Sequence, residues 1–147
     1  MSRPSWDQYF LQQCELVAKR GTCPRKQVGA IVVKNKRIVA TGYNGSLPGL
    51  PHCEDVGCDM DEGHCVRTIH SECNAVSQLI DERGKEFTEG CVLYCNVRPC
   101  WKCFQTIVTF SHIKKIIYSG EYREDNMISD ALDLMPDYLF VRIGQNE

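Results

Sequence analysis

Short apolar runs alternate along this chain with segments whose apolar residues recur at helical spacing. The run VGAIVV at 28–33 is almost wholly apolar, which is typical of a strand that is covered on both faces. Strands of this kind share one sheet, and helices cover its faces. Further strands are predicted at 37–42, after the polar turn 34–36, and at 90–97, 114–120 and 138–144.

Four other segments carry the spacing of amphipathic helices. In the first of them Phe10, Cys14 and Val17 lie on one face, and Gly21 follows as a stop signal. The order αββαβαβαβ predicts an α/β fold, a three-layer α/β/α sandwich with a central five-stranded mixed sheet. From the length of 147 residues we expect a single domain, 1–147. The helices are predicted at 5–20, 69–80, 129–135 and from about Pro99 onward.

The composition argues against two classes of partner. A formal net charge of -2, with 17 Lys and Arg against 19 Asp and Glu, does not support the basic face that binds nucleic acid. No stretch approaches the ~18 apolar residues that a membrane span needs, and the first residues contain no apolar signal region. We therefore expect a cytoplasmic protein with reduced thiols, whose ten cysteines are metal ligands or buried apolar residues.

Two predicted helix starts carry residue types that bind zinc. His70 lies at one of them, and Cys100 and Cys103 lie at the other. Three protein ligands leave the fourth tetrahedral position for water, which is the pattern of a catalytic zinc site and not of a closed structural one. Glu72 follows His70 by two residues, so its carboxylate can stand beside the metal and move protons. The sequence therefore predicts a hydrolytic zinc centre.

Each of these residues has a simpler explanation when it is taken alone. A C-x-x-C pair is more often half of a structural zinc site or a redox dithiol. His70 alone can be a hydrogen-bonded core histidine, and Glu72 alone a carboxylate that favours a helix N-terminus. The order, the spacing and the positions at helix starts agree together only for the catalytic centre.

The pattern H-x-E…P-C-x-x-C resembles the signature of the zinc-dependent nucleobase deaminases. The stretches GTCPRKQVGAIVV, ATGYNGSLPG, HCVRTIHSECNA, LYCNVRPCWKCFQTIV and IIYSGEY are similar to bacterial and phage deoxycytidylate (dCMP) deaminases. The GYNG element distinguishes this family from cytidine, cytosine, guanine and tRNA adenosine deaminases. Ser71, Cys73 and the stretch 96–99 depart from the usual family residues, with alanine common at the position of Ser71. None of these departures removes a predicted ligand or Glu72.

The resemblance implies a fold and an activity. The fold is cytidine deaminase-like, and the reaction is hydrolysis of dCMP to dUMP and ammonia, which supplies the precursor of thymidylate. Zinc-activated water would attack C4 of cytosine, and Glu72 would pass its proton to N3 and later to the leaving amine. The resemblance also implies a homo-hexamer that dCTP activates, with Mg²⁺ as a companion of this effector, and that dTTP inhibits. The implied effector region comprises Gly42, Tyr43, Asn44 and Gly45.

The resemblance also implies contacts with the nucleotide. Asn44 would lie near the sugar. Tyr118 and Tyr122 are candidates to cover the sugar, although an aromatic pair at a strand end more often serves packing. The base pocket would be lined by Val28 and Ala30, with Ser71 as a further contact at the helix start. The assignments of Asn44, Val28 and Ala30 follow from the family pattern, and the positions of these side chains in the fold test them.

A 5′-phosphate requires positive charge or unpaired N–H groups. Arg25, just before the first strand of the sheet, is the first candidate, and Arg98 and Lys102 are alternatives. The simpler explanation for each of these three residues is a solvated surface charge.

A second group of cysteine and histidine residues lies in the segment 45–67, which has no periodicity. So long a stretch without secondary structure needs something to hold it, and a closed structural zinc site would do so. The resemblance implies Cys23 and Cys53 as two ligands, and leaves the others open among Cys58, His64 and Cys65. Buried thiols and a surface histidine are the alternative. The other cysteines, including Cys73 and Cys95, are predicted to pack in the core.

Two rival hypotheses remain at this point. The first is a deaminase of another base or nucleoside, such as cytidine, cytosine or tRNA adenosine. The tRNA case requires basic surface for several phosphates, which the net charge does not favour. The second is a zinc-binding module without catalysis, which would require a fourth protein ligand beside Cys100 and Cys103.

Overall fold

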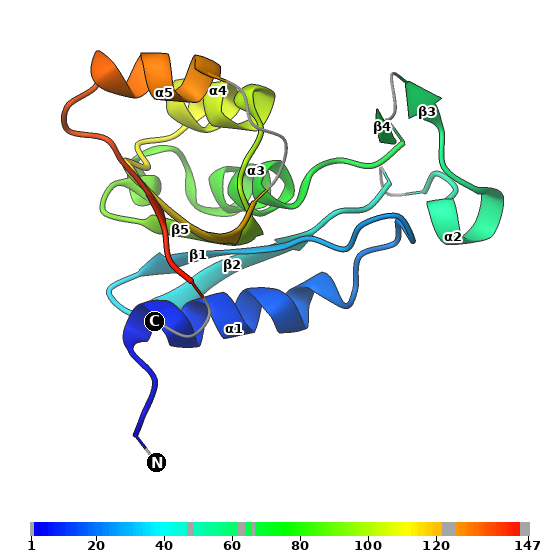
Figure 1. Ribbon diagram of the computed structural model, residues 1–147, viewed down its shortest axis with the longest axis horizontal. Coiled ribbons are helices and arrows are strands. Elements are labelled where there is room, and N and C mark those ends of the chain that lie inside the picture. Colours follow the sequence, from blue (N-terminus) through cyan, green and yellow to red (C-terminus); the bar gives the residue numbers. More distant parts are fainter. Residues whose placement is uncertain (1, 47–48, 62–63, 66, 122–125, 145–147) are drawn as a thin grey trace.

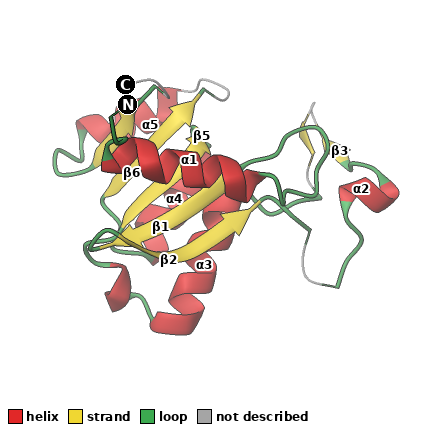
Figure 2. Ribbon diagram, turned by 90° about the horizontal axis from the view of Figure 1, so that it is seen from below, coloured by secondary structure: helices red, strands yellow, loops and turns green. Residues whose placement is uncertain are grey.

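A five-stranded mixed sheet lies at the centre of the computed structural model, which describes residues 2–46, 49–61, 64–65, 67–121 and 126–144. Helix α1 (Trp6–Ala18) covers one face of this sheet, as Figures 1 and 2 show. The other face is covered by α3 (Ser71–Arg83), α4 (Trp101–Phe110) and α5 (Asn126–Asp133). The predicted three-layer α/β/α sandwich is therefore confirmed.

The strand order across the sheet is β2-β1-β5-β6-β7. The pairs β1–β2 and β1–β5 are antiparallel, whereas β5–β6 and β6–β7 are parallel. Helices α4 and α5 form the crossovers that parallel pairs need. The strands are β1 (Gly29–Lys34), β2 (Arg37–Tyr43), β5 (Val92–Val97), β6 (Lys115–Gly120) and β7 (Leu139–Arg142).

The predicted apolar strand is β1, and it is buried on both faces except at its last residue, Lys34. One face packs on α1 through Ile31 and Val33, and the other lies in the larger core through Ala30 and Val32. The turn after it has positive φ at Asn35 and Lys36, 52° and 61°, as a two-residue hairpin requires. The predicted hairpin is confirmed.

Helix α3 lies unusually close to strand β2 at Gly42. A Cβ atom placed there would come within 2.5 Å of the Ser71 carbonyl oxygen and of the Ala75 backbone nitrogen. The absence of a side chain at Gly42 therefore lets the first turn of α3 rest on the sheet. This contact fixes where the predicted ligand His70 and the predicted acid Glu72 lie.

A small projection extends from one end of the sheet in both ribbon views (Figures 1 and 2). It consists of α2 (Cys53–Val56) and the two-residue strands β3 (Met60–Asp61) and β4 (His64–Cys65). These elements were not predicted, because one helical turn and two-residue strands are too short to show periodicity. Among the helices that the structure describes, none has the combination of length and apolar character that crossing a bilayer requires.

Candidate metal centre

The first turns of α3 and α4 meet at the end of the sheet and bring the predicted zinc ligands together. His70 and Cys100 are the N-cap residues of these helices, and neither side chain caps its own helix within the described chain. The Nδ1 atom of His70 lies 3.5 Å from Cys100 Sγ and 3.3 Å from Cys103 Sγ. With Glu72 included, the potential ligand atoms all lie within 4.8 Å of one another. The structure thus assembles all four residues predicted for the hydrolytic centre.

Hydrogen bonding within this cluster favours a thiolate at Cys100 beside a protonated His70. Hydrogen bonds from Cys103 and then from His70 lower the pKa of Cys100 to about 4, despite partial burial. The hydrogen bond to Cys100 is also the main reason why the pKa of His70 rises to about 9. The pKa of Cys103 is raised, because its thiol donates to Cys100. The cluster therefore holds a thiolate at neutral pH, and thiolate is the form in which cysteine binds zinc.

The two carboxylate oxygens of Glu72 have different surroundings. Glu72 is only 4% exposed. Its Oε2 atom accepts a hydrogen bond of 2.9 Å from the Ser71 hydroxyl and a longer one of 3.7 Å from the Cys95 thiol. Burial raises the pKa of Cys95 well above its usual value, so this thiol keeps its proton and donates it. The other oxygen, Oε1, lies 3.8 Å from His70 Nδ1 and faces the cluster.

A second cluster of thiols lies where the projection joins the rest of the protein. The Sγ atoms of Cys23, Cys53 and Cys58 lie within 4.8 Å of one another, and Cys23 and Cys58 are 3.6 Å apart. Cys23 and Cys53 are buried. Three thiols that converge in this way suit a structural zinc. The side chains of the other two candidates, His64 and Cys65, lie outside the described part of the chain.

The GYNG segment braces the site from the side of the sheet. Gly45 and Ile69 pair through two backbone hydrogen bonds, of 2.8 and 3.3 Å, directly before His70. The carbonyl of Tyr43 accepts a hydrogen bond of 3.0 Å from the side chain of Asn74 on α3. Both contacts hold the start of α3, so the segment predicted to respond to effectors is joined physically to a predicted zinc ligand.

Two predicted substrate contacts have mainly internal partners. The Asn44 side chain is buried, accepts a hydrogen bond of 2.9 Å from the Val28 N–H and donates one of 2.6 Å to the Lys26 carbonyl. Asn44 therefore holds the chain that leads into β1. Ala30 lies in the core with 0% of its surface exposed, so it offers a ligand no accessible surface here.

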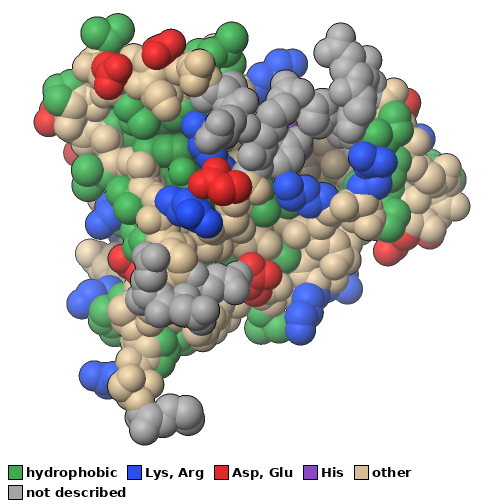
Figure 3. Space-filling model, in the orientation of Figure 1, with side chains coloured by type: hydrophobic (Ala, Val, Ile, Leu, Met, Phe, Trp, Pro, Cys, Tyr) green, Lys and Arg blue, Asp and Glu red, His purple; other side chains and the backbone are tan. Residues whose placement is uncertain are grey.

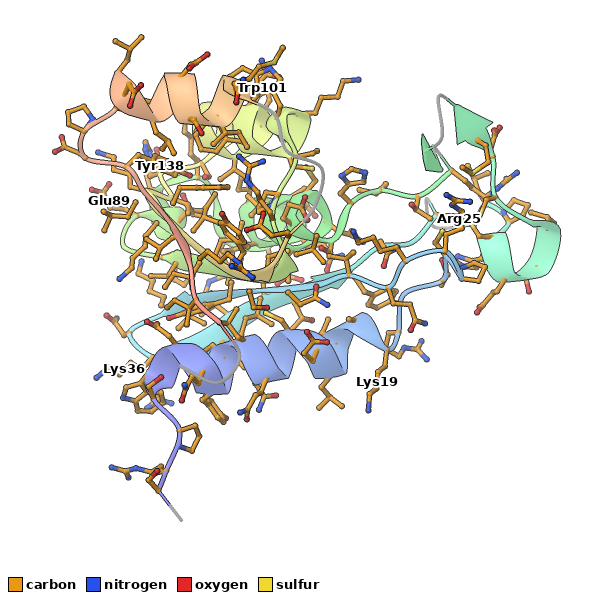
Figure 4. All side chains as sticks on the ribbon, in the orientation of Figure 1. Lys19, Arg25, Lys36, Glu89, Trp101 and Tyr138 are labelled. Carbon is orange, nitrogen blue, oxygen red and sulfur yellow. The ribbon has the colours of Figure 1, made fainter. Side chains whose placement is uncertain are left out.

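The remaining predicted contacts are more scattered. The Ser71 side chain is fully buried and directed to Glu72. Arg25 is exposed and lies by the projection, well separated in Figure 4 from Trp101, the residue after Cys100. Tyr122 lies outside the described residues.

Comparison with known proteins decides the family. Residues 4–120 match the family model of the cytidine and deoxycytidylate deaminase zinc-binding region. The chain is a member of this deaminase family.

Individual relatives agree with this assignment. ComE operon protein 2 of Bacillus subtilis (strain 168) is 45% identical over 84% of this chain, which spans 64% of that protein. The deoxycytidylate deaminase of Schizosaccharomyces pombe is 33% identical over 88% of this chain, which spans only 42% of it. The matched part of this chain thus spans less than two thirds of both relatives. It spans 99% of the deoxycytidylate deaminase of Mycobacterium phage D29, with 35% identity over 82% of its own length.

A solved structure shares the fold over nearly the whole chain. It is the dCMP deaminase from the cyanophage S-TIM5 in complex with dCMP and dUMP, with a TM-score of 0.74 and 28% sequence identity. The match covers 97% of this chain and 100% of the phage chain. The expectation of a cytidine deaminase-like fold is confirmed.

Sequence reasoning missed two neighbours of the candidate metal centre. Cys73 was predicted to pack in the core, but it is half-buried and donates to Cys103 across 3.2 Å. Its position three residues after His70, on the same helix face, was the available signal. Cys95 is buried as predicted, yet its contact with Glu72 depends on how β5 faces α3. No local sequence pattern shows that contact.

Proposed function

We propose that this protein is a zinc-dependent deaminase that hydrolyses dCMP to dUMP and ammonia. The observation that carries the proposal is the convergence of His70, Cys100, Cys103 and Glu72, whose ligand atoms lie within 4.8 Å of one another. Relatives named deoxycytidylate deaminase, and a structural neighbour in complex with dCMP and dUMP, support the choice of substrate.

Zinc would be held by the imidazole of His70 and the thiolates of Cys100 and Cys103. Two sulfur ligands and one nitrogen ligand are a set that zinc accepts, and a site with three protein ligands is typical of catalytic zinc. When bound, zinc acts as a Lewis acid that makes water nucleophilic at neutral pH. The Cys73 thiol lies 3.2 Å from Cys103 Sγ, but among the described residues the ligand atoms that all lie within 4.8 Å of one another belong to His70, Glu72, Cys100 and Cys103. The presence of a carboxylate in this set favours an enzyme over a closed structural module.

Glu72 would transfer the protons of the reaction. Its Oε2 atom is anchored by Ser71 and Cys95, so Oε1 is the oxygen positioned to accept the proton of the attacking water. Glu72 then delivers this proton to N3 of the ring. It takes the second proton from the new hydroxyl group and gives it to the amino group, which leaves C4 as ammonia while the C4 carbonyl forms. Such proton transfer typically contributes about 10²- to 10⁴-fold in rate.

Substrate contacts remain part of the proposal. Val28 and Asn44 would border the base and sugar, Tyr122 would cover the sugar, and Arg25 would attract the charged nucleotide. Ala30 and Ser71 would support the site without touching the substrate, because both are fully buried. On the face in Figure 3, the visible Lys and Arg side chains are interspersed with Asp and Glu side chains. This distribution suits a small charged substrate better than a polynucleotide.

We also propose a structural zinc at Cys23, Cys53 and Cys58, since three converging thiols would tie the projection to the start of β1. Activation by dCTP with Mg²⁺, inhibition by dTTP and assembly into a hexamer are proposed from the family resemblance. The backbone pairing of Gly45 with Ile69 offers such regulation a direct connection to His70.

The test is ammonia release by the purified, zinc-loaded protein from dCMP, deoxycytidine, CMP and cytosine, each with and without dCTP. We expect turnover of dCMP well above that of the other three. Equal turnover of deoxycytidine would refute the nucleotide assignment and favour a nucleoside deaminase. Inactivity toward all four, with zinc bound, would favour the binding module.

A further inference from the structure

Arg98 is a buried cation without a hydrogen-bonding partner for part of its guanidinium group. The residue is 8% exposed, and its Nη1 atom is inaccessible to water yet makes no hydrogen bond with any described residue. A guanidinium group keeps its charge in proteins, and buried charges are normally paired. A buried donor of this kind therefore calls for an acceptor that the described residues do not supply.

The surroundings of Arg98 position the group without neutralising it. Its backbone N–H donates to the carbonyl of Gly120 across 2.7 Å, which ties the segment after β5 to the end of β6. Its guanidinium carbon lies 5.5 Å from the ring centroid of Phe140, so the ring supports one face of the group. Glu121 follows Gly120 but pairs with Arg142 at 3.2 Å. The described residues thus hold the guanidinium in place by an aromatic face and leave it without a carboxylate.

Arg98 also lies close to the metal centre along the chain. It precedes Cys100 by two residues, and two extended residues span at most about 7 Å. The long side chain of Arg98 adds to the distance that this residue can span. The separation along the chain is therefore short enough for one ligand to have its base at the centre and its anionic group, one sugar away, beside Arg98.

We propose that Arg98 binds the 5′-phosphate and makes the enzyme selective for nucleotides over nucleosides. This inference rests on the proposed function. Phosphate oxygens match the planar fork of a guanidinium group and can accept two of its N–H groups. Arg25 and Lys102 are exposed, so water and salt screen their charges. A buried and preoriented charge discriminates more strongly, because the nucleoside leaves it unpaired.

The test compares dCMP with deoxycytidine in the zinc-loaded wild type and in Arg98→Met, which keeps a long apolar side chain against Phe140. We expect kcat/KM for dCMP to fall by roughly 10- to 100-fold, mainly through KM, because a hydrogen-bonded charge is lost. The value for deoxycytidine should change by less than about 2-fold by the same reasoning. Arg98→Lys should recover part of the loss, since it restores the charge without the fork. Arg37→Met, which removes an exposed arginine at the far end of β2, is the matched control.

The ratio of the two substrates separates recognition from structural damage. An equal loss for dCMP and deoxycytidine would make Arg98 a packing residue and overturn the proposal, as would an unchanged ratio. Binding of the product dUMP, measured by calorimetry, gives a second readout that does not require turnover. Arg98→Met should weaken it by a similar factor, and unchanged binding would overturn the proposal. The preference of the wild type tests the proposed function separately, because it involves no variant.

Discussion

The close approach of α3 to β2 makes Gly42 a sensitive position. In Gly42→Ala the new Cβ atom would lie 2.5 Å from the backbone of Ser71 and Ala75, whereas ordinary contacts begin near 3.4 Å. Backbone atoms of a helix cannot turn aside as a side chain can, so α3 must move by about 0.9 Å, the difference between these two distances. This movement carries His70 and Glu72 with it.

We expect Gly42→Ala to lower the catalytic rate more than the folding stability. Overpacking of this kind costs about 1–3 kcal/mol of folding free energy, which lowers Tm by roughly 3–10 °C in a protein of this size. A displacement near 1 Å at a catalytic group can cost about 10²-fold in rate, so we expect kcat for dCMP to fall by that order. The measurements are ammonia release, thermal unfolding and zinc content.

Gly45→Ala is the matched control for stability. A Cβ atom there would meet its nearest neighbour at 3.6 Å, so it fits without movement, and we expect Tm to change little. If Gly42→Ala unfolded at the wild-type temperature and kept its kcat, α3 would not rest on β2 as the structure has it. Sheet packing at Gly42 would then not determine the position of the metal centre.

Three further predictions concern the two clusters. Glu72→Gln should lower kcat by about 10²- to 10⁴-fold while the zinc content stays unchanged, because the amide cannot accept the proton; normal turnover would assign proton transfer to another group. Ser71→Ala should lower kcat by up to about 10-fold with KM unchanged, since Glu72 Oε2 loses its shorter hydrogen bond. Ser71→Thr should recover the rate. A change confined to KM would contradict the role of Ser71 in anchoring Glu72. Cys58→Ser should reduce bound zinc by one ion per chain and lower Tm, whereas a wild type with a single zinc per chain would exclude the second site.

Much of this architecture was predictable from local patterns. The apolar run of β1, the turn at Asn35 and Lys36, and the helices that begin near His70 and Cys100 all follow from the residues themselves. Periodicity and turn chemistry act within a few residues, so sequence order preserves them. The projection was not predicted because its elements are too short to show a period, and its hydrogen bonds depend on partners elsewhere in the chain.

Some features of the candidate metal centre were likewise predictable from the sequence, and others only from the tertiary structure. Residue type and spacing alone predicted that His70, Glu72, Cys100 and Cys103 come together, because zinc and proton transfer need those groups near helix starts. Only the folded chain could show that Cys95 donates to Glu72, that Cys73 donates to Cys103, and that Ala30 is enclosed in the core. These contacts join residues on separate elements, and the packing of α3 against β5 and α4 decides them. Likewise, Arg98 became distinct from the other basic residues only when the fold buried it and left its Nη1 atom without a hydrogen-bonding partner among the described residues. The sequence determines which chemical groups are available. The tertiary structure decides which of them are buried away from water and therefore need a hydrogen-bonding or charged partner.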